Sequence, residues 1–347
     1  MAQNYPPGVI GAGSFGLTIA MLLSKKQDVL VYVRSEDQAR EMNENHKIRG
    51  VEFSSSITAT TSISDFCENV RLIFPAVPSK NFAGMVQDFS PFLRPSHMMI
   101  HCTKGFDSLD LDPSGDEAID SSDSFKIRTM SEVILEESSV RRVGCLAGPN
   151  LAKEIQEGLP TASVIASPYD EIIEMGQQAL NSDSFFVFGS HDMRGTELAG
   201  ALKNIIALGA GILDGRSMGK NIQSMLITRG LREMIYLGKA VGSDSRAFLG
   251  TAGIGDLIAT ATSSKSRNYS VGYRLGQGDS LDTILSGMDE VAEGIRTLKI
   301  AKTLAERYGV RVPIMHVLYK VVFENFDISR AINYLMRYPF APDVDFL

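Results

Sequence analysis

Residues 8–16 read GVIGAGSFG, a short apolar run that leads into three glycines, Gly11, Gly13 and Gly16. An amphipathic segment over 14–26 follows, so the glycines stand between an expected strand and an expected helix. Glycines at this spacing allow a tight turn, a close approach of the backbone to a pyrophosphate, and close packing of helix on strand. The N–H groups that begin the helix attract phosphate. The stretch therefore predicts a dinucleotide-binding βαβ unit.

Beyond this loop, the first half of the chain alternates short apolar runs with amphipathic segments such as 14–26 and 36–44. The alternation predicts a mostly parallel, doubly wound sheet, that is, an α/β Rossmann-type domain over residues 1–190. Pro6 and Pro7 predict a short first strand, and Pro75 falls inside another strand, where proline cannot donate to the ladder. Strands are expected at 8–10, 28–33, 71–77, 98–102, 142–147, 161–166 and 184–188.

After about residue 190 the strand pattern disappears and apolar residues recur at helical spacing. We therefore expect an all-α second domain over residues 191–347, with the boundary near 189–194. Its helices are expected at 195–213, 220–240, 246–262, 268–276, 289–308, 313–325 and 328–337.

Composition places the chain among ordinary globular proteins. It has 347 residues, 44% hydrophobic and 22% charged, and this length favours two domains. The net charge of −7 argues against nucleic acid or an anionic membrane as a partner. Three widely spaced cysteines fit no metal or redox motif, and the start of the chain does not resemble a signal peptide. We expect a cytoplasmic protein with no metal and a small-molecule substrate.

Two local features concern the cofactor and a loop. The second expected strand ends at Tyr32-Val33-Arg34-Ser35, and no acid follows before Glu36. An acid at this place favours NAD, whereas an arginine accommodates the 2′-phosphate of NADP, so Arg34 suits NADP and leaves NAD possible. Residues 107–123 carry seven acids and no base, which predicts an exposed loop.

The segment 197–215, ELAGALKNIIALGAGILDG, places Lys203 among small and apolar residues. A lysine is almost never fully buried without compensation. Either its ammonium reaches solvent along an apolar stem, or it is held inside for a chemical purpose. The segment alone leaves both readings open.

Four polar clusters are expected near the carboxyl ends of the strands and in the helical half, at 104–105, 148–154, 203–204 and 250–268. The last contains Asp256 in a glycine-rich turn and ends in Ser266-Arg267-Asn268 before another helical run. A hydroxyl cap, a guanidinium and an amide at a helix start suit a phosphate, although a plain helix cap with a solvent-facing arginine has the same sequence.

Nine short motifs, which occur in a fixed order along the chain, indicate a resemblance to a known protein family. Between residues 8 and 340 it resembles the NAD(P)-dependent glycerol-3-phosphate dehydrogenases of the soluble bacterial type. The motifs are GAGSFG (11–16), AVPS (76–79), TKG (103–105), GPNLAKE (148–154), LKN (202–204), ITRGL (227–231), GIGDL (253–257), SRN (266–268) and VAEG (291–294).

The resemblance implies reversible hydride transfer between NAD or NADP and glycerol 3-phosphate, which yields dihydroxyacetone phosphate. It further implies supply of glycerol 3-phosphate for phospholipid synthesis, and a homodimer. Lys203 matches the proton acceptor of the family, and Asn150 stands where the family often has Ser or Thr. The matching substrate positions are Lys104, Gly148, Asn150, Lys203, Asp256, Ser266, Arg267 and Asn268, and the matching cofactor positions are Gly11, Gly13, Ser14, Phe15, Gly16, Arg34, Lys104, Ala152, Arg267, Val291 and Glu293.

Two alternatives remain at this stage. A two-domain β-hydroxyacid dehydrogenase would also place a lysine on the first helix of its second domain, but it would need a carboxylate site and not obviously Ser-Arg-Asn. A regulator that binds NAD(P) without turnover would have no need of a proton acceptor such as Lys203.

Overall fold

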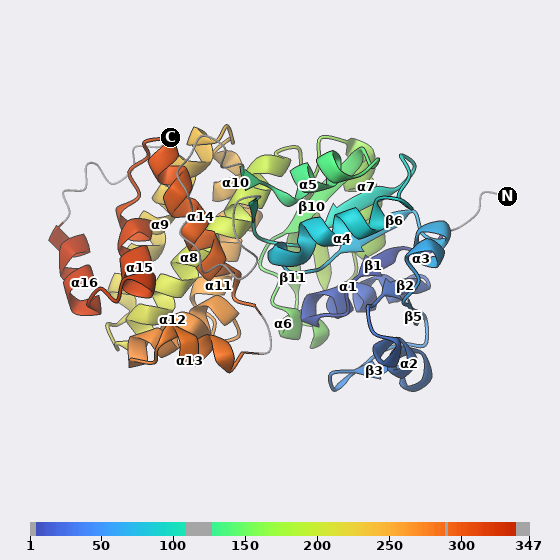
Figure 1. Ribbon diagram of the computed structural model, residues 1–347, viewed down its shortest axis with the longest axis horizontal. Helices are drawn as coiled ribbons and strands as arrows, with labels where there is room; N and C mark the ends of the chain where they lie inside the picture. Colours follow the sequence, from blue (N-terminus) through green and yellow to red (C-terminus); the bar gives the residue numbers. More distant parts are fainter. Residues whose placement is uncertain (1–4, 109–126, 289–290, 338–347) are drawn as a thin grey trace. The chain divides into compact units, whose positions relative to one another are not determined.

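The computed structural model describes residues 5–108, 127–288 and 291–337, and the chain forms two compact units. The first unit comprises residues 1–107 and 128–193, and the second comprises 108–127 and 194–347. In Figure 1 the first unit is a sheet flanked by helices, whereas the second is built from helices. The predicted fold class, a Rossmann-type α/β domain followed by an all-α domain, is confirmed.

The first unit is organised by an eight-stranded sheet with the order β12-β11-β10-β7-β6-β1-β2-β5. All neighbouring strands run parallel except β10 and β11, which are antiparallel. The first strand has only three residues, as the two prolines before it predict. The strands are β1 (Gly8–Ile10), β2 (Val29–Tyr32), β5 (Ile57–Thr60), β6 (Leu72–Pro75), β7 (Met98–His101), β10 (Arg142–Ala147), β11 (Thr161–Ala166) and β12 (Phe185–Ser190).

Helices cover both faces of this sheet. On one face α1 and α7 contribute Leu17, Leu23 and Ile172 to a buried apolar cluster. On the other face α3, α4 and α5 contribute residues such as Phe66 and Phe89 to a second cluster. The helices are α1 (Ser14–Ser24), α2 (Glu36–Asn45), α3 (Ile63–Asn69), α4 (Phe82–Phe89), α5 (Met130–Glu137), α6 (Ala152–Gln156) and α7 (Asp170–Leu180), with a 3-10 turn η1 (Ser79–Asn81).

Pro75 is accommodated at the carboxyl end of a central strand. The Cys102 backbone N–H donates to the Pro75 carbonyl at 2.8 Å, and the Met98 N–H donates to Arg71 at 2.9 Å. In the ladder between these two bonds, the N–H of residue 75 would point at the Ile100 carbonyl, and proline has none. The Cys102 thiol donates to that carbonyl at 3.8 Å, and burial raises the pKa of this thiol to about 12. The thiol therefore keeps its proton and partly replaces the missing donor.

Both edge strands of the sheet are hydrogen-bonded by side chains. On β5 the Asn43 amide accepts from the Ala59 N–H at 2.8 Å and donates to the Ala59 carbonyl at 3.0 Å. On β12 Asn181 accepts from the Val187 N–H at 2.7 Å, and Gln177 donates to the Val187 carbonyl at 2.9 Å. Side-chain amides thus occupy backbone groups that a further strand would use.

Two short ladders accompany the sheet. One pairs β3 (Lys47–Ile48) with β4 (Val51–Glu52), and the other pairs β8 (Asp107–Ser108) with β9 (Ile127–Arg128). The buried Arg128 guanidinium donates to Asp107 at 2.7 Å. The acidic loop expected at 107–123 lies outside the described residues from 109 onward, so only its first two residues are seen, in β8.

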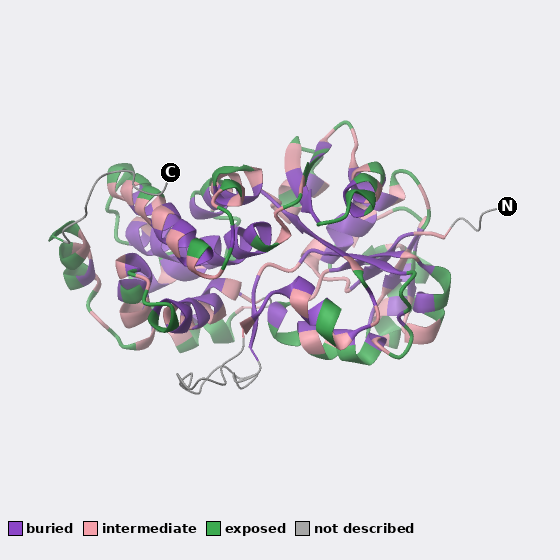
Figure 2. Cartoon of the chain, turned by 90° about the horizontal axis from the view of Figure 1, so that it is seen from above, coloured by how far each residue is buried: buried purple, intermediate pink, exposed green. Residues whose placement is uncertain are grey.

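The second unit is built around α8 (Met193–Gly215), most of whose residues are buried. Among the described residues α8 is the one helix long and apolar enough to cross a membrane, but 94% of its apolar window is buried inside the protein, as in the core helix of a globular domain. Figure 2 shows buried residues on the inward faces of the helices and exposed residues on their outer faces. The other helices are α9 (Lys220–Ala240), α10 (Arg246–Leu249), α11 (Asp256–Ala261), α12 (Arg267–Gln277), α13 (Leu281–Ser286), α14 (Glu293–Arg307), α15 (Pro313–Phe323) and α16 (Ile328–Arg337).

One helix expectation is wrong. The segment 246–262 is not a single helix, because a π-helical turn, η2 (Thr251–Gly255), separates α10 from α11. The glycines at 250, 253 and 255 account for the break, since glycine weakens helix interiors and permits unusual backbone geometry.

Candidate active site

The glycine-rich loop leaves an open cradle at the start of α1. Gly11 has a φ of +101°, and a Cβ on Gly16 would lie 2.0 Å from the Gly11 carbonyl oxygen, so turn and helix pack backbone to backbone. A Cβ on Gly13 would meet no heavy atom within 4 Å, and Gly13 caps α1 without a side-chain hydrogen bond. The first N–H groups of α1, at Ser14 and Phe15, therefore suit a dinucleotide pyrophosphate.

The end of β2 carries no carboxylate between Tyr32 and Ser35, as the sequence shows. Arg34 is exposed, and the Ser35 hydroxyl accepts from the Gln38 N–H to cap α2. The first acid, Glu36, accepts a hydrogen bond from the Thr61 hydroxyl. The end of β2 therefore presents a guanidinium, and no carboxylate, at the place where Rossmann-type domains bind the adenosine ribose of a dinucleotide.

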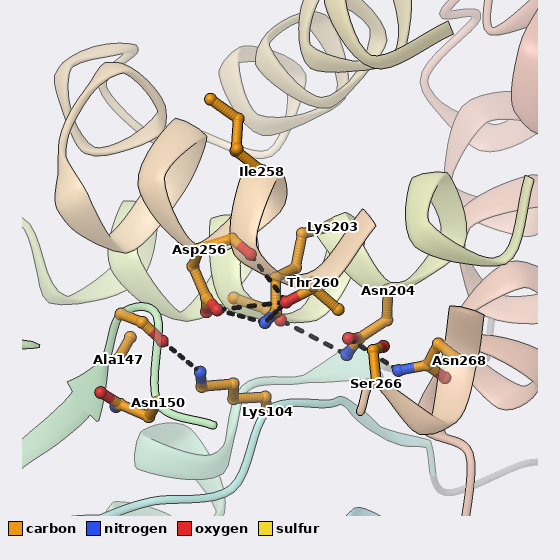
Figure 3. Close-up of polar contacts among 12 residues, drawn as sticks. Lys104, Ala147, Asn150, Lys203, Asn204, Asp256, Ile258, Thr260, Ser266 and Asn268 are labelled. Carbon is orange, nitrogen blue, oxygen red and sulfur yellow. Dashed lines mark hydrogen bonds and ion pairs between the residues drawn. The ribbon is translucent and has the colours of Figure 1, made fainter. Parts of the chain in front are cut away.

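In the second unit, Lys203 of α8 is buried together with an acid and a hydroxyl (Figure 3). The Lys203 ammonium donates to the Asp256 carboxylate and, at 2.5 Å, to the Thr260 hydroxyl. Lys203, Asp256 and Thr260 are 4%, 1% and 5% exposed. Of the two readings of Lys203, the solvent-reaching one is wrong: its charge is compensated inside by an ion pair. The Asp256 carboxylate fixes the direction in which the ammonium points.

The position of Asp256 is set by the π-helical turn η2, which directly precedes it. A Cβ on Gly253 would lie 2.1 Å from the Phe248 carbonyl oxygen, so glycine is required for this close π-helical turn. Single π turns are frequent at functional sites. The turn ends at Asp256, the first residue of α11, and Thr260 follows one helical turn later. The Thr260 hydroxyl also donates to the Asp256 carbonyl at 2.7 Å, which fixes its rotamer.

Helices α8 and α12 pack in parallel through glycine. A Cβ on Gly272 would lie 1.9 Å from the Leu208 carbonyl oxygen, and a Cβ on Gly276 would lie 2.5 Å from that of Ile212. One turn earlier, the Asn268 amide nitrogen donates to the Asn204 side-chain oxygen at 2.9 Å (Figure 3). All three pairs are 64 residues apart, so backbone contact between the helices sets the start of α12 against the residue beside Lys203.

The start of α12 has the features of an anion site. The Ser266 hydroxyl caps the helix by accepting from the Tyr269 N–H. Arg267 is exposed, and its guanidinium donates to the Val291 carbonyl at 2.8 Å. The N–H groups of Arg267 and Asn268 lie in the first turn, where the helix dipole favours a negative charge.

The first unit holds a separate polar group at the end of β10. The Lys104 ammonium donates to the Gly148 carbonyl at 2.8 Å. Gly148 has a φ of +137°, which favours glycine. Asn150 donates to the Ser163 hydroxyl at 3.0 Å, while its own side-chain oxygen is buried without a hydrogen-bond partner.

Within each unit, the structure brings several sequence-predicted residues together. Lys203 meets Asp256, and Lys104 meets Gly148, while Ala152 begins α6 and Val291 and Glu293 stand at the start of α14. Asn204 and Thr260 lie within the predicted clusters 203–204 and 250–268, but sequence reasoning gave neither residue a role of its own. Two signals in the sequence could have indicated them. Thr260 lies four residues after Asp256 and so on the same face of a helix, and Asn204 directly follows Lys203. In the described parts of the chain, no group of three His, Cys, Asp or Glu side chains could hold a metal ion.

Comparison with known proteins completes the picture. The profile described as NAD-dependent glycerol-3-phosphate dehydrogenase N-terminus matches residues 8–173, and that for the C-terminus of the same family matches residues 192–333. A glycerol-3-phosphate dehydrogenase (NAD(P)+) from Ectopseudomonas mendocina is 39% identical over 352 residues, covering 100% of this chain and 98% of the relative.

Solved structures agree. Glycerol-3-phosphate dehydrogenase from Coxiella burnetii superposes with a TM-score of 0.85 at 29% identity, over 96% of this chain and 99% of the other. The yeast (Saccharomyces cerevisiae) enzyme, at 22% identity and a TM-score of 0.80 over 95% of this chain and 98% of the other, shares the fold.

Proposed function

The chain belongs to the NAD-dependent glycerol-3-phosphate dehydrogenase family, and from this premise we propose the reaction it catalyses and the residues that perform it. The reaction is reversible hydride transfer between a nicotinamide dinucleotide and C2 of glycerol 3-phosphate, with dihydroxyacetone phosphate as the oxidised partner. The observation that carries the proposal is the buried Lys203 ammonium with Asp256 and Thr260 as its acceptors. A dehydrogenase needs such a proton donor and acceptor beside the reacting oxygen.

In reduction, Lys203 donates a proton to O2 of dihydroxyacetone phosphate as C2 receives the hydride. In oxidation, its neutral amine takes the proton from the C2 hydroxyl. Asp256 stabilises the ammonium between turnovers, and Thr260 fixes the direction of its N–H groups. When bound, the dinucleotide supplies or accepts the hydride.

The phosphate of the substrate is assigned to the start of α12. A guanidinium from Arg267, the N–H groups of the first helical turn and the helix dipole form a suitable environment for a dianion. This chemistry favours a phosphorylated substrate over a β-hydroxyacid, whose carboxylate carries less charge. We further assign Lys104, Gly148 and Asn150 to contacts with the substrate, on the family likeness.

The dinucleotide is assigned to the glycine loop of the first unit. The open space beside Gly13 and the uncapped start of α1 fit a pyrophosphate, and the absence of a carboxylate from Tyr32 to Ser35 leaves room for either NAD or NADP. Further cofactor contacts are assigned, by family likeness, to Ser14, Phe15, Arg34, Lys104, Ala152, Arg267, Val291 and Glu293.

A spectrophotometric assay tests the proposal. Purified protein should oxidise NADPH or NADH when dihydroxyacetone phosphate is added. In the same assay β-ketoacids should give a much lower kcat/KM, and so should β-hydroxyacids compared with glycerol 3-phosphate when NAD+ or NADP+ is the hydride acceptor. Lys203→Ala should lower kcat by roughly 10²–10⁴-fold with the Kd of the reduced cofactor nearly unchanged. Lys25→Ala, an exposed lysine at the end of α1, is the matched control. Binding of NADPH without turnover would support a regulator instead.

Arg267→Ala provides a separate test of the phosphate site. Its KM for dihydroxyacetone phosphate should rise more than tenfold, since a charge-assisted contact of about 1.5–3 kcal/mol is lost. An unchanged KM would remove Arg267 from the phosphate site and leave the reaction itself intact.

Three broader assignments complete the proposal. The enzyme acts in the cytoplasm, supplies glycerol 3-phosphate for phospholipid synthesis and forms a homodimer. Residues 1–190 bind the dinucleotide, and residues 191–347 bind the substrate and carry the catalytic lysine. The family likeness supports these assignments. Sedimentation equilibrium of the purified chain tests the homodimer, and cell fractionation tests the location.

A further inference from the structure

The side chain of Asn268 is committed to two neighbours inside the second unit. Its amide nitrogen donates to the Asn204 oxygen at 2.9 Å, and its oxygen accepts from the Gly294 backbone N–H at 2.8 Å. Asn268 and Asn204 are buried. Three segments of chain, α8, α12 and the start of α14, therefore meet at one amide.

The contact with Gly294 acts as a helix cap. The N-cap residue of α14 is Ala292, which makes no side-chain cap hydrogen bond. The N–H groups of a first helical turn need acceptors, and buried ones are costly when unpaired. Asn268 supplies an acceptor to the second residue of α14 from 26 residues earlier in the chain.

The packing at Gly294 leaves no space for a side chain. A Cβ there would lie 2.8 Å from the Asn204 backbone oxygen and 2.8 Å from the Asn268 side-chain oxygen. The preceding residue of α12, Arg267, donates to the Val291 carbonyl. Two adjacent residues at the start of α12 thus hold the segment 291–294 at both its ends.

We infer that Asn268 is a positioning residue that fixes the segment 291–294 for the dinucleotide, in addition to the contribution of its backbone N–H to the phosphate site. The inference rests on the proposed function, which gives Val291 and Glu293 to the cofactor. Through its two bonds, Asn268 ties this segment to Asn204, the neighbour of Lys203. Its side chain therefore acts on cofactor affinity, whereas a side-chain ligand of the substrate would act on substrate affinity alone.

The test is the affinity of the protein for NADPH in the absence of substrate, measured by fluorescence titration. Asn268→Ala should raise this Kd about threefold to tenfold, because the start of α14 loses its cap. Ser266→Ala removes the cap of α12 instead, and should raise the KM for dihydroxyacetone phosphate while leaving the NADPH Kd within twofold. An unchanged NADPH Kd in Asn268→Ala, together with a raised KM for the substrate, would overturn the inference in favour of a direct ligand.

Gly294→Ala repeats the test from the other side of the contact. Its Cβ would lie 2.8 Å from the Asn268 side-chain oxygen and 2.8 Å from the Asn204 backbone oxygen, so it displaces the start of α14 from both while the amide is unaltered. The NADPH Kd should therefore rise to at least a similar extent, with a folded circular dichroism spectrum. If Asn268→Ala fails to fold, this variant decides, and an unchanged Kd again refutes the inference. The wild-type protein is titrated with NADPH and assayed for turnover in parallel. If the wild type binds NADPH and reduces dihydroxyacetone phosphate, an unchanged NADPH Kd in the variants counts against the positioning role of Asn268 and not against the proposed function.

Discussion

Thr260→Val removes one acceptor of the buried Lys203 ammonium, together with the bond from the Thr260 hydroxyl to the Asp256 carbonyl. Valine has nearly the shape of threonine, so packing in α11 is preserved while the hydroxyl at 2.5 Å from the Lys203 nitrogen is lost. The Asp256 carboxylate remains in place. The variant therefore removes the hydroxyl and its bonds to Asp256 while both members of the ion pair remain.

The expected loss follows from the burial of these groups. Thr260 is 5% exposed and Lys203 is 4% exposed, so water does not readily replace the missing acceptor. A hydrogen bond to a charged group contributes about 1.5–3 kcal/mol. If that stabilisation orients the ammonium for proton transfer, kcat for reduction of dihydroxyacetone phosphate should fall by roughly 10- to 150-fold.

Steady-state assays at saturating NADPH, with a titration of cofactor binding, measure this effect. Thr262→Val is the matched control, because the exposed Thr262 hydroxyl donates to the carbonyl four residues earlier, that of Ile258, at 2.8 Å, as the Thr260 hydroxyl donates to that of Asp256. This control removes the shared bond to the backbone, and the acceptor of the Lys203 ammonium is kept. Thr260→Ser keeps the hydroxyl and should recover most of kcat. The reasoning fails if Thr260→Val retains kcat within twofold of wild type, or if Thr262→Val loses as much.

Three further predictions concern stability, measured as the free energy of unfolding in urea. Gly272→Ala should lower the free energy of unfolding by at least about 2 kcal/mol, since its Cβ would lie 1.9 Å from the Leu208 oxygen. Gly84→Ala, whose Cβ would meet no atom within 4 Å, should be neutral or stabilising, and equal effects would refute the glycine-mediated packing of α8 on α12. Burial lowers the pKa of His97 below its usual 6.5, and its Nδ1 accepts from the Arg94 N–H. The unfolded chain therefore binds a proton at His97 more readily than the folded protein does, so the free energy of unfolding should fall as the pH drops below 6.5. The fall should be less steep in His97→Asn. Burial raises the pKa of Glu233 to about 8, so stability should fall as pH rises from 4.5 to 8, a slope that Glu233→Gln should flatten.

Strong local patterns were enough to predict much of the fold. Strands β10 and β11 and helix α9 begin and end where the sequence places them, because continuous apolar or periodic runs are bounded there by turn residues. Strand β5 (Ile57–Thr60) was missed, since it is half polar and lies within a run of serine and threonine. The reversal of β11 was also missed, because strand direction depends on the path of the connection and not on composition.

The site was predictable by residue type but not by partner. Lysine among apolar residues marks Lys203, and a glycine turn marks Asp256, yet no local signal states that they form an ion pair. That pairing depends on the π-helical turn before α11. The glycines at 211, 215, 272 and 276 recur every four residues, which is a signal for close helix packing, but their partner helix follows only from the three-dimensional structure.

The amide side chains on the edge strands bear on how copies of the protein can assemble. Asn43 occupies the backbone of Ala59, and Asn181 with Gln177 occupies that of Val187. Edge strands with open backbone groups invite strand addition and aggregation, so these side chains act as stoppers at the two ends of the sheet. A second copy cannot lengthen the sheet at either position without displacing them. These amide side chains therefore disfavour self-association by strand addition at Ala59 and Val187.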